Sequence, residues 1–176
     1  RGSEMCIRDR VAVNDLADPE DLFWLTQYDT ILGRYPGELE RTEKGFRIDG
    51  RDVAFFQEAD PTKLPWGELG VDLVIECTGI FTTGPKAQAH LDAGAKKVLI
   101  SAPAKEVDGT FVMGVNEHTY DAETMHIVSN ASCTTNCLAP MAKVLNDEFG
   151  IVDGIMTTIH ALSLIHISEP TRLRRI

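Results

Sequence analysis

The sequence lacks the features that mark membrane, secreted and nucleic-acid-binding proteins. Its 176 residues contain no apolar run close to the ~20 residues that a membrane-spanning helix needs. The four cysteines form no paired pattern and no secretory leader is recognisable, which favours a reducing, cytoplasmic compartment. The net charge of −10 argues against a surface that binds nucleic acid. We therefore expect neither nucleic acid nor a membrane among the partners.

A glycine-rich phosphate-binding turn is also missing. No two of the 14 glycines stand two residues apart, so there is no G-x-G-x-x-G turn to hold a dinucleotide pyrophosphate at a helix N-terminus. The hydrophobic share of 43% and the charged share of 25% are nevertheless those of an ordinary globular chain. A chain of this length can bury a real core without disulfides.

The two ends differ in character from the middle. Residues 1–10 and 163–176 hold more Arg than acidic residues, whereas the segment between them is strongly acidic. Both ends resemble translated sequencing-adapter read-through, and we expect them to be non-family artefacts outside the fold. A genuine basic tail that binds a partner is the alternative.

Hydrophobic patterning predicts an α/β protein with a doubly wound parallel sheet. The nearly continuous apolar run at 71–77 is typical of a strand in such a sheet, and strands alternate with helices along the chain. Residues 151–161, which alternate in polarity from Ile155 onward, are expected to form a strand that begins a second sheet. The other predicted elements are strands at 11–15, 97–101, 111–113 and 126–129, a hairpin around Asp49-Gly50, and helices from 18–20 onward, at 85–93 and at 132–149.

The segment SNASCTTNC, residues 129–137, carries the most chemical information. It places Cys133 between a strand end and a helix N-terminus, where unpaired N–H groups favour a thiolate and can hold an oxyanion. A buried small hydrophobe is the alternative for Cys133, and packing is the favoured interpretation for Cys77 and Cys137. No metal site is expected, because the C-x3-C spacing has no second pair.

A nucleophilic cysteine needs a base within hydrogen-bond reach. Among the histidines, His160 is favoured, because a helix that packs back on the following strand brings the strand's end toward the helix's start. His90 and His118 are expected to be solvated. The alternative for His160 is a histidine that merely ends a strand.

Asp15 ends the first predicted strand. In a dinucleotide-binding fold, an acidic residue at the end of a strand accepts hydrogen bonds from the adenosine ribose hydroxyls. An ordinary strand-end cap is the alternative, since the glycine-rich turn that should precede Asp15 is missing.

At these residues the sequence resembles the glyceraldehyde-3-phosphate dehydrogenase family. SNASCTTNCLAP (129–140) is similar to that family's nucleophile signature, and blocks such as VAVND, VIECTGIFTT and MTTIHA follow in the family's order through residues 11–161. The resemblance implies a partial NAD-binding domain at 11–131, with an incomplete doubly wound, Rossmann-like sheet. It also implies the start of the catalytic α+β domain, with the nucleophile helix and a first strand, at 132–162.

The resemblance implies NAD-dependent oxidation of glyceraldehyde 3-phosphate, with inorganic phosphate as the second substrate and glycolysis as the setting. Cys133 would be the nucleophile that forms a thiohemiacetal and then a thioester. His160 would serve as the acid–base group. Ser132 and Thr134 would flank the substrate, and Thr134 would help to bind phosphate.

For the cofactor, the resemblance assigns the ribose contact to Asp15, which Leu16 follows in the NAD-preferring pattern, and a further contact to Ser101. The family's first strand and glycine-rich turn have no counterpart at the N-terminus, and Ala59 stands where the family usually has Arg. After Ala161 the sequence leaves the family pattern. We therefore expect the chain as written to bind NAD poorly and to be nearly inactive, while the parent enzyme forms a homotetramer.

Three alternatives remain at this point. Erythrose-4-phosphate dehydrogenase shares the cysteine motif. A non-catalytic fragment could act as a redox sensor or bind partners through the thiol of Cys133. A cysteine hydrolase would need a group that orients His160, and no acidic residue is obviously placed for that.

Overall fold

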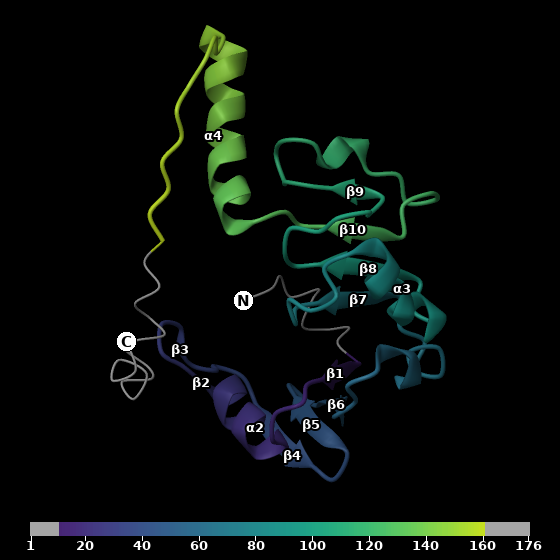
Figure 1. Cartoon of the computed structure of the whole chain (residues 1–176). Helices are drawn as coiled ribbons and strands as arrows, with labels where there is room; N and C mark the ends of the chain where they lie inside the picture. The colour runs from purple at the N-terminus through teal and green to yellow at the C-terminus, as the bar shows by residue number, and fades with distance from the viewer. Residues whose placement is uncertain (1–10, 161–176) are drawn as a thin grey trace, which may run out of the picture.

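The computed structural model describes residues 11–160, which form two four-stranded sheets (Figure 1). The strands of the first sheet, in spatial order, are β1 (Ala12–Asn14), β6 (Arg51–Phe56), β5 (Gly45–Ile48) and β4 (Leu39–Thr42). Those of the second are β7 (Leu73–Glu76), β8 (Lys97–Ile100), β10 (Ile127–Ser129) and β9 (Gly109–Thr110). Ala12 and Phe56 of the first sheet pack against the core of the second, so the two sheets are neighbours.

The first sheet is organised by a tight hairpin. Asp49 and Gly50 both have positive φ, 50° and 78°, the combination that a two-residue turn needs to match strand twist. This turn joins β5 to β6 as predicted, and it sets the register that pairs Ile48 with Arg51. The strand β4 adds to the other side of β5. Phe46, Ile48 and Val53 form the small core on this sheet.

A short helix and a hairpin follow β1. The helix α2 (Pro19–Gln27) begins where expected, because the Asp18 carboxylate accepts the Glu20 N–H at 2.7 Å and Pro19 occupies the first turn. The strands β2 (Tyr28–Asp29) and β3 (Gly33–Arg34) then pair antiparallel.

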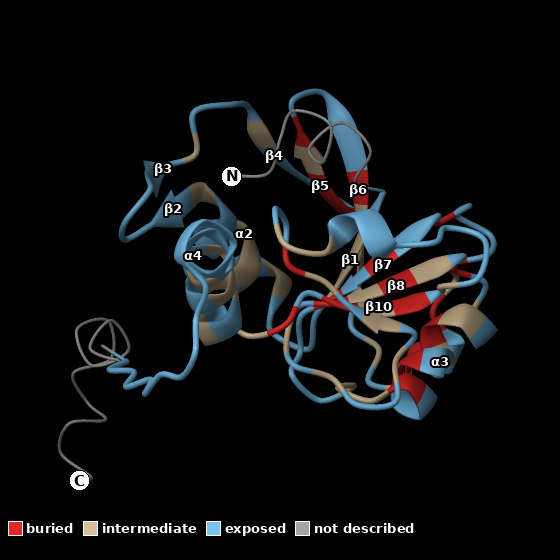
Figure 2. Cartoon of the chain, turned by 90° about the horizontal axis from the view of Figure 1, so that it is seen from above, coloured by how far each residue is buried: buried red, intermediate tan, exposed pale blue. Residues whose placement is uncertain are grey.

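The second sheet is entirely parallel, as the apolar runs predict. The helix α3 (Gly84–Asp92) covers one face, and Figure 2 shows buried positions on α3 and on β7, β8 and β10, in addition to those on β5 and β6. Ala87, Val98 and Ile100 are almost fully enclosed there. Two short 3-10 helices, η1 (Pro61–Lys63) and η2 (Glu117–Thr119), lie in the connections. On the opposite face, Leu73 and Ile75 of β7 remain half exposed, so the run is buried on one side only.

The prediction of a strand at 111–113 is wrong. The strand β9 ends at Thr110, where it still pairs with β10. The side chain of Asn116 then accepts the Val112 N–H and donates to the Thr110 carbonyl, both at 2.9 Å. This side chain closes a turn and uses the backbone groups that a longer strand would need.

The prediction of a strand at 151–161 is also wrong for every residue that the structure describes. Residues 151–160 follow the helix α4 (Cys133–Phe149) as extended chain without a strand partner in the described range, and residue 161 lies outside that range. Val152 and Ile155 are 100% exposed. Alternating polarity marks a face that can be buried, but only a neighbouring strand can pair the N–H and C=O groups.

The helix α4 stands apart from the sheets in Figure 1, and no residue of it is buried. Across the described residues, no helix combines the length and the apolar character needed to cross a bilayer.

Candidate active site

A strained turn delivers Cys133 to the start of α4. The strand β10 ends at Ser129, whose hydroxyl donates to the Ala102 carbonyl at 2.7 Å and accepts the Ala131 N–H at 3.0 Å. Ala131 has a φ of 58°, a left-handed conformation that costs a non-glycine residue roughly 1 kcal/mol. After this turn, Cys133 is the first residue of the helix, and its thiol is free and exposed.

Ser132 is the N-cap of α4. Its Oγ accepts the Thr135 N–H at 3.0 Å and lies 2.8 Å from Thr135 Oγ1. The side-chain amide of Asn136 donates to the carbonyls of Asn130 and Ser132 at 2.6 and 3.0 Å. The predicted substrate neighbour therefore has a structural task in this structure, which is to hold the first turn of α4 in place.

His160 and Thr134 are brought together, although the segment between them was expected to be a strand. The chain after α4 runs back along the helix toward its N-terminal end (Figure 1). His160 Nε2 lies 3.1 Å from Thr134 Oγ1 and 3.1 Å from Thr158 Oγ1. An exposed imidazole thus sits beside the residue that follows Cys133.

The two predicted cofactor residues lie at strand ends but in different sheets. Asp15 directly follows β1; its N–H donates to the Phe56 carbonyl at 3.1 Å, and its exposed carboxylate accepts the Ala17 N–H at 2.9 Å. Ser101 follows β8 and donates its N–H to the Glu76 carbonyl at 3.0 Å. Ser101 and the turn leading to Cys133 share one edge of the second sheet, because β8 and β10 are parallel neighbours.

The expectation that Cys77 and Cys137 are packed inside is wrong. Cys77 comes after β7 has ended at Glu76, and its thiol is exposed. Cys137 is exposed on α4, because no described element covers that helix. The described residues contain no cluster of His, Cys, Asp and Glu that could hold a metal ion.

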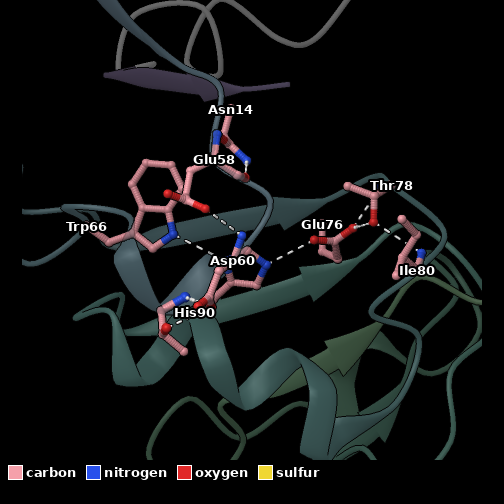
Figure 3. Close-up of polar contacts among 9 residues, drawn as sticks. Asn14, Glu58, Asp60, Trp66, Glu76, Thr78, Ile80 and His90 are labelled. Atoms are coloured by element: carbon pink, nitrogen blue, oxygen red, sulfur yellow. Dashed lines mark hydrogen bonds and ion pairs between the residues drawn. The ribbon is translucent and has the colours of Figure 1, made fainter. Parts of the chain in front are cut away.

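His90 was expected to be solvated, and this is wrong as well. The residue is 4% exposed, and its ring lies between Trp66 and Glu76 in Figure 3. Trp66 Nε1 donates to His90 Nδ1 at 3.2 Å, and His90 Nε2 lies 2.9 Å from Glu76 Oε2. The sequence does contain a signal for this contact: Glu76 ends the apolar run of β7, and a carboxylate buried there needs a hydrogen-bond partner that is buried as well.

Glu76 is a buried carboxylate that stays ionised. Burial by itself would raise its pKa, but the hydrogen bonds from His90 and Thr78 outweigh burial and hold the pKa of Glu76 below the ordinary value. Glu76 Oε1 accepts the Thr78 N–H at 2.6 Å and also the Thr78 hydroxyl. The charge therefore ties the end of β7 to the loop that follows it.

Two models of known protein families match the chain. Residues 7–84 match the model of the glyceraldehyde 3-phosphate dehydrogenase NAD-binding domain, and residues 132–165 match that of the same enzyme's C-terminal domain.

Named relatives agree with the two domain matches. The chain is 58% identical over 151 residues to a glyceraldehyde-3-phosphate dehydrogenase of Streptomyces coelicolor, covering 86% of this chain and 45% of that protein. It is 59% identical over 151 residues to the enzyme of that name from Clostridium pasteurianum, with the same coverage of 86% and 45%. The chain thus spans a little under half the length of these relatives. With both domain models and these identities in agreement, the chain belongs to the glyceraldehyde-3-phosphate dehydrogenase family.

Proposed function

We propose that this chain belongs to a phosphorylating glyceraldehyde-3-phosphate dehydrogenase, in which Cys133 is the nucleophile and His160 the acid–base group. One observation carries the proposal: His160 Nε2 lies 3.1 Å from the Oγ1 atom of Thr134. Thr134 belongs to the first turn of α4 and directly follows Cys133, whose thiol is exposed. Membership of the family supports an aldehyde phosphate and inorganic phosphate as the substrates, and the cytoplasm as the setting.

The chemistry of the site follows from these two side chains. His160 Nε2 takes the thiol proton of Cys133, and the sulfur adds to the aldehyde carbon, whose oxygen gains a proton to give a thiohemiacetal. The chemistry supplied by bound NAD would be acceptance of a hydride from that carbon while His160 takes the hydroxyl proton, which would leave a thioester on Cys133. A phosphate oxygen then attacks the thioester carbon, and the Cys133 thiolate leaves.

The strand ends fit the cofactor's polar groups. Asp15 presents an exposed carboxylate next to β1, which suits the hydroxyls of an adenosine ribose. Ser101 is exposed at the edge of the second sheet that also carries the turn to Cys133. Ser132 and Thr134 place hydroxyls on both sides of the nucleophile, and the Thr134 hydroxyl is the group proposed to meet phosphate.

The family relationship supports the homotetramer that we propose for the parent protein, and α4, of which no residue is buried, leaves a surface that the rest of that protein can cover. The apolar side chains that remain exposed on this helix are Leu138, Met141, Val144, Leu145 and Phe149. Apolar side chains gathered on one helix are typical of a surface that another part of the protein covers.

The test uses the covalent half of the reaction, because it needs no cofactor. Iodoacetamide alkylation of Cys133 is followed by peptide mass spectrometry, with and without glyceraldehyde 3-phosphate. We expect the aldehyde to slow alkylation of Cys133 several-fold, and erythrose 4-phosphate to slow it less.

Cys77 and Cys137, also exposed, are internal controls whose alkylation rates should not change. In His160→Gln, alkylation of Cys133 at neutral pH should be several-fold slower than in the wild type. Equal protection of all three thiols, or none at Cys133, would contradict the proposed function.

A further inference from the structure

A buried line of polar side chains runs beneath the edge of the second sheet that carries Ser101 and the turn to Cys133. Trp66, His90 and Glu76 are 5%, 4% and 4% exposed, and in Figure 3 they point toward one another from the segment after η1, from α3 and from the end of β7. None of these three side chains takes part in the chemistry proposed above. A buried polar group has to be justified by its hydrogen bonds.

The geometry determines where the protons lie. An indole nitrogen can only donate, so the contact from Trp66 requires His90 Nδ1 to be an acceptor without a proton. The proton of the neutral ring is then on Nε2, which donates to Glu76 Oε2 at 2.9 Å. His90 is therefore neutral, and Glu76 carries the negative charge.

The same carboxylate also shapes the loop after β7. Glu76 Oε1 accepts both the N–H and the hydroxyl of Thr78. Because the Thr78 hydroxyl donates its proton to Glu76, its oxygen is left to accept the Ile80 N–H at 3.1 Å. Phe81 then packs edge-on against the His90 ring, with the ring centroids 5.9 Å apart. From both sides, the successive hydrogen bonds are thus donated in the direction of Glu76: from Trp66 through His90, and from Ile80 through Thr78.

The shaped loop lies where an open parallel sheet binds its ligand. Residues 77–83 connect the carboxyl end of β7 to α3, and the neighbouring strand end carries Ser101, whose N–H donates to the Glu76 carbonyl. Ligands of such sheets bind outside the carboxyl ends of the strands. Thr78, Gly79 and Ile80 are exposed at this edge.

We propose that Glu76, fixed by the neutral His90 and by Trp66 behind it, is a positioning residue that holds the 77–83 loop in the shape that receives the dinucleotide. This inference rests on the proposed function for its ligand. These buried residues would act on the cofactor only through the 77–83 loop, without contacting the cofactor themselves.

A carboxylate is needed at position 76, because His90 donates to one of its oxygens and Thr78 donates to the other. In Glu76→Gln, an amide oxygen that kept the Thr78 bonds would turn the amide NH2 toward the His90 N–H. The ring would have to move its proton to Nδ1, where it meets the Trp66 N–H. Gln has almost the same shape as Glu, yet one of the hydrogen bonds that join Trp66, His90, residue 76 and Thr78 must be lost.

Two variants of His90 separate its two contacts. An Asn side-chain oxygen occupies about the place of Nδ1, and a Gln side-chain nitrogen about the place of Nε2. His90→Gln therefore keeps the donor to Glu76, whereas His90→Asn keeps only the acceptor for Trp66. A merely space-filling role for the ring would not distinguish these two variants in this way.

The experiment measures amide hydrogen exchange by NMR on the full chain. We expect the Thr78 and Ile80 amides to exchange about tenfold faster in His90→Asn and Glu76→Gln, and close to wild type in His90→Gln. The Val98 amide, which donates to the His126 carbonyl, reports that the sheet is intact. NAD affinity, measured by titration, should fall about tenfold in His90→Asn and Glu76→Gln, while the rate of Cys133 alkylation stays unchanged.

The ring nitrogens provide a readout that needs no variant. Nitrogen-15 spectra of the wild-type chain should show His90 neutral and protonated at Nε2. A charged ring, an Nδ1–H ring, or exchange at Thr78 and Ile80 that is the same in all variants would overturn the positioning role. A wild-type chain that binds no NAD would agree with the missing glycine-rich turn, and the tautomer and exchange data would then decide the positioning role. Alkylation of Cys133 that the aldehyde does not slow would instead contradict the proposed function.

Discussion

At the scale of single residues, the start of α4 depends on one hydroxyl. Ser132 Oγ accepts the Thr135 N–H, and this bond closes the turn that begins with Cys133. Without it, the first N–H groups of the helix would have only water as a partner. The cap therefore positions the proposed nucleophile as well as stabilising the helix.

Replacing Ser132 tests this point. Ser132→Ala should lower the free energy of unfolding by about 1 kcal/mol, and Ser132→Asp should restore most of it, because Asp caps as well as Ser does. Urea unfolding followed by circular dichroism measures both. Ser101→Ala, at an exposed strand end, is the matched control and should change stability by less than about 0.5 kcal/mol. Equal losses in Ser132→Ala and Ser132→Asp would show that the cap bond is unimportant.

Residue-scale prediction succeeded where local rules act. Cys133 begins a helix because a strand end, a small polar turn and a capping serine are contiguous in the sequence, and the structure has all three there. His90 shows the opposite. Whether a helical histidine is buried depends on Trp66 and Glu76, which lie 24 and 14 residues away in the chain.

At the scale of elements, α3 begins in close contact with the loop at 105–106. The Gly84 N–H donates to the Lys105 carbonyl at 2.9 Å, and a Cβ at Gly84 would stand 1.8 Å from the Glu106 carbonyl oxygen. Only a residue without a side chain fits between these two segments. The helix that carries His90 is placed by this contact.

Gly84→Ala should therefore destabilise the protein, by roughly 2–3 kcal/mol, since the backbone must shift to make room for the methyl group. Gly67→Ala is the control, because its Cβ would meet its nearest neighbour, the Gly94 Cα, at an ordinary 3.5 Å. Thermal unfolding of the two variants measures the difference. If Gly84→Ala is as stable as Gly67→Ala, the close approach has no energetic consequence.

At the scale of the whole molecule, stability depends on carboxylates that bind backbone amides across the fold. Asp108 Oδ2 accepts the N–H groups of Ile127 and His126, at 2.8 and 2.7 Å, and so joins the loop before β9 to the start of β10. These two bonds, the Ile127 bond first, lower the pKa of Asp108. Glu76 has its pKa lowered in the interior of the same sheet.

Because these pKa values are lowered in the folded state, the stability that they contribute is complete above the ordinary carboxyl range. It is lost as the pH falls below the ordinary value of 3.8 for Asp108 and through the lowered folded value. Urea midpoints measured from neutral pH down to about pH 3 should fall, and fall less steeply in Asp108→Asn. Glu68→Gln, at an exposed carboxylate, is the control. The same acid dependence in Asp108→Asn as in the wild type would contradict this assignment.

The sequence by itself determined what depends on neighbours along the chain. The Asp49-Gly50 turn, the Asp18 cap of α2, the apolar parallel strands and the helix start at Cys133 all follow from residues a few positions apart. Family membership was also readable from the segment 129–140. Only the tertiary structure decided that His90 is buried, that Cys77 and Cys137 are exposed and that residues 151–160 form no strand. The physical reason is that burial and strand pairing depend on partners distant in the sequence, and no local pattern records whether those partners are in place.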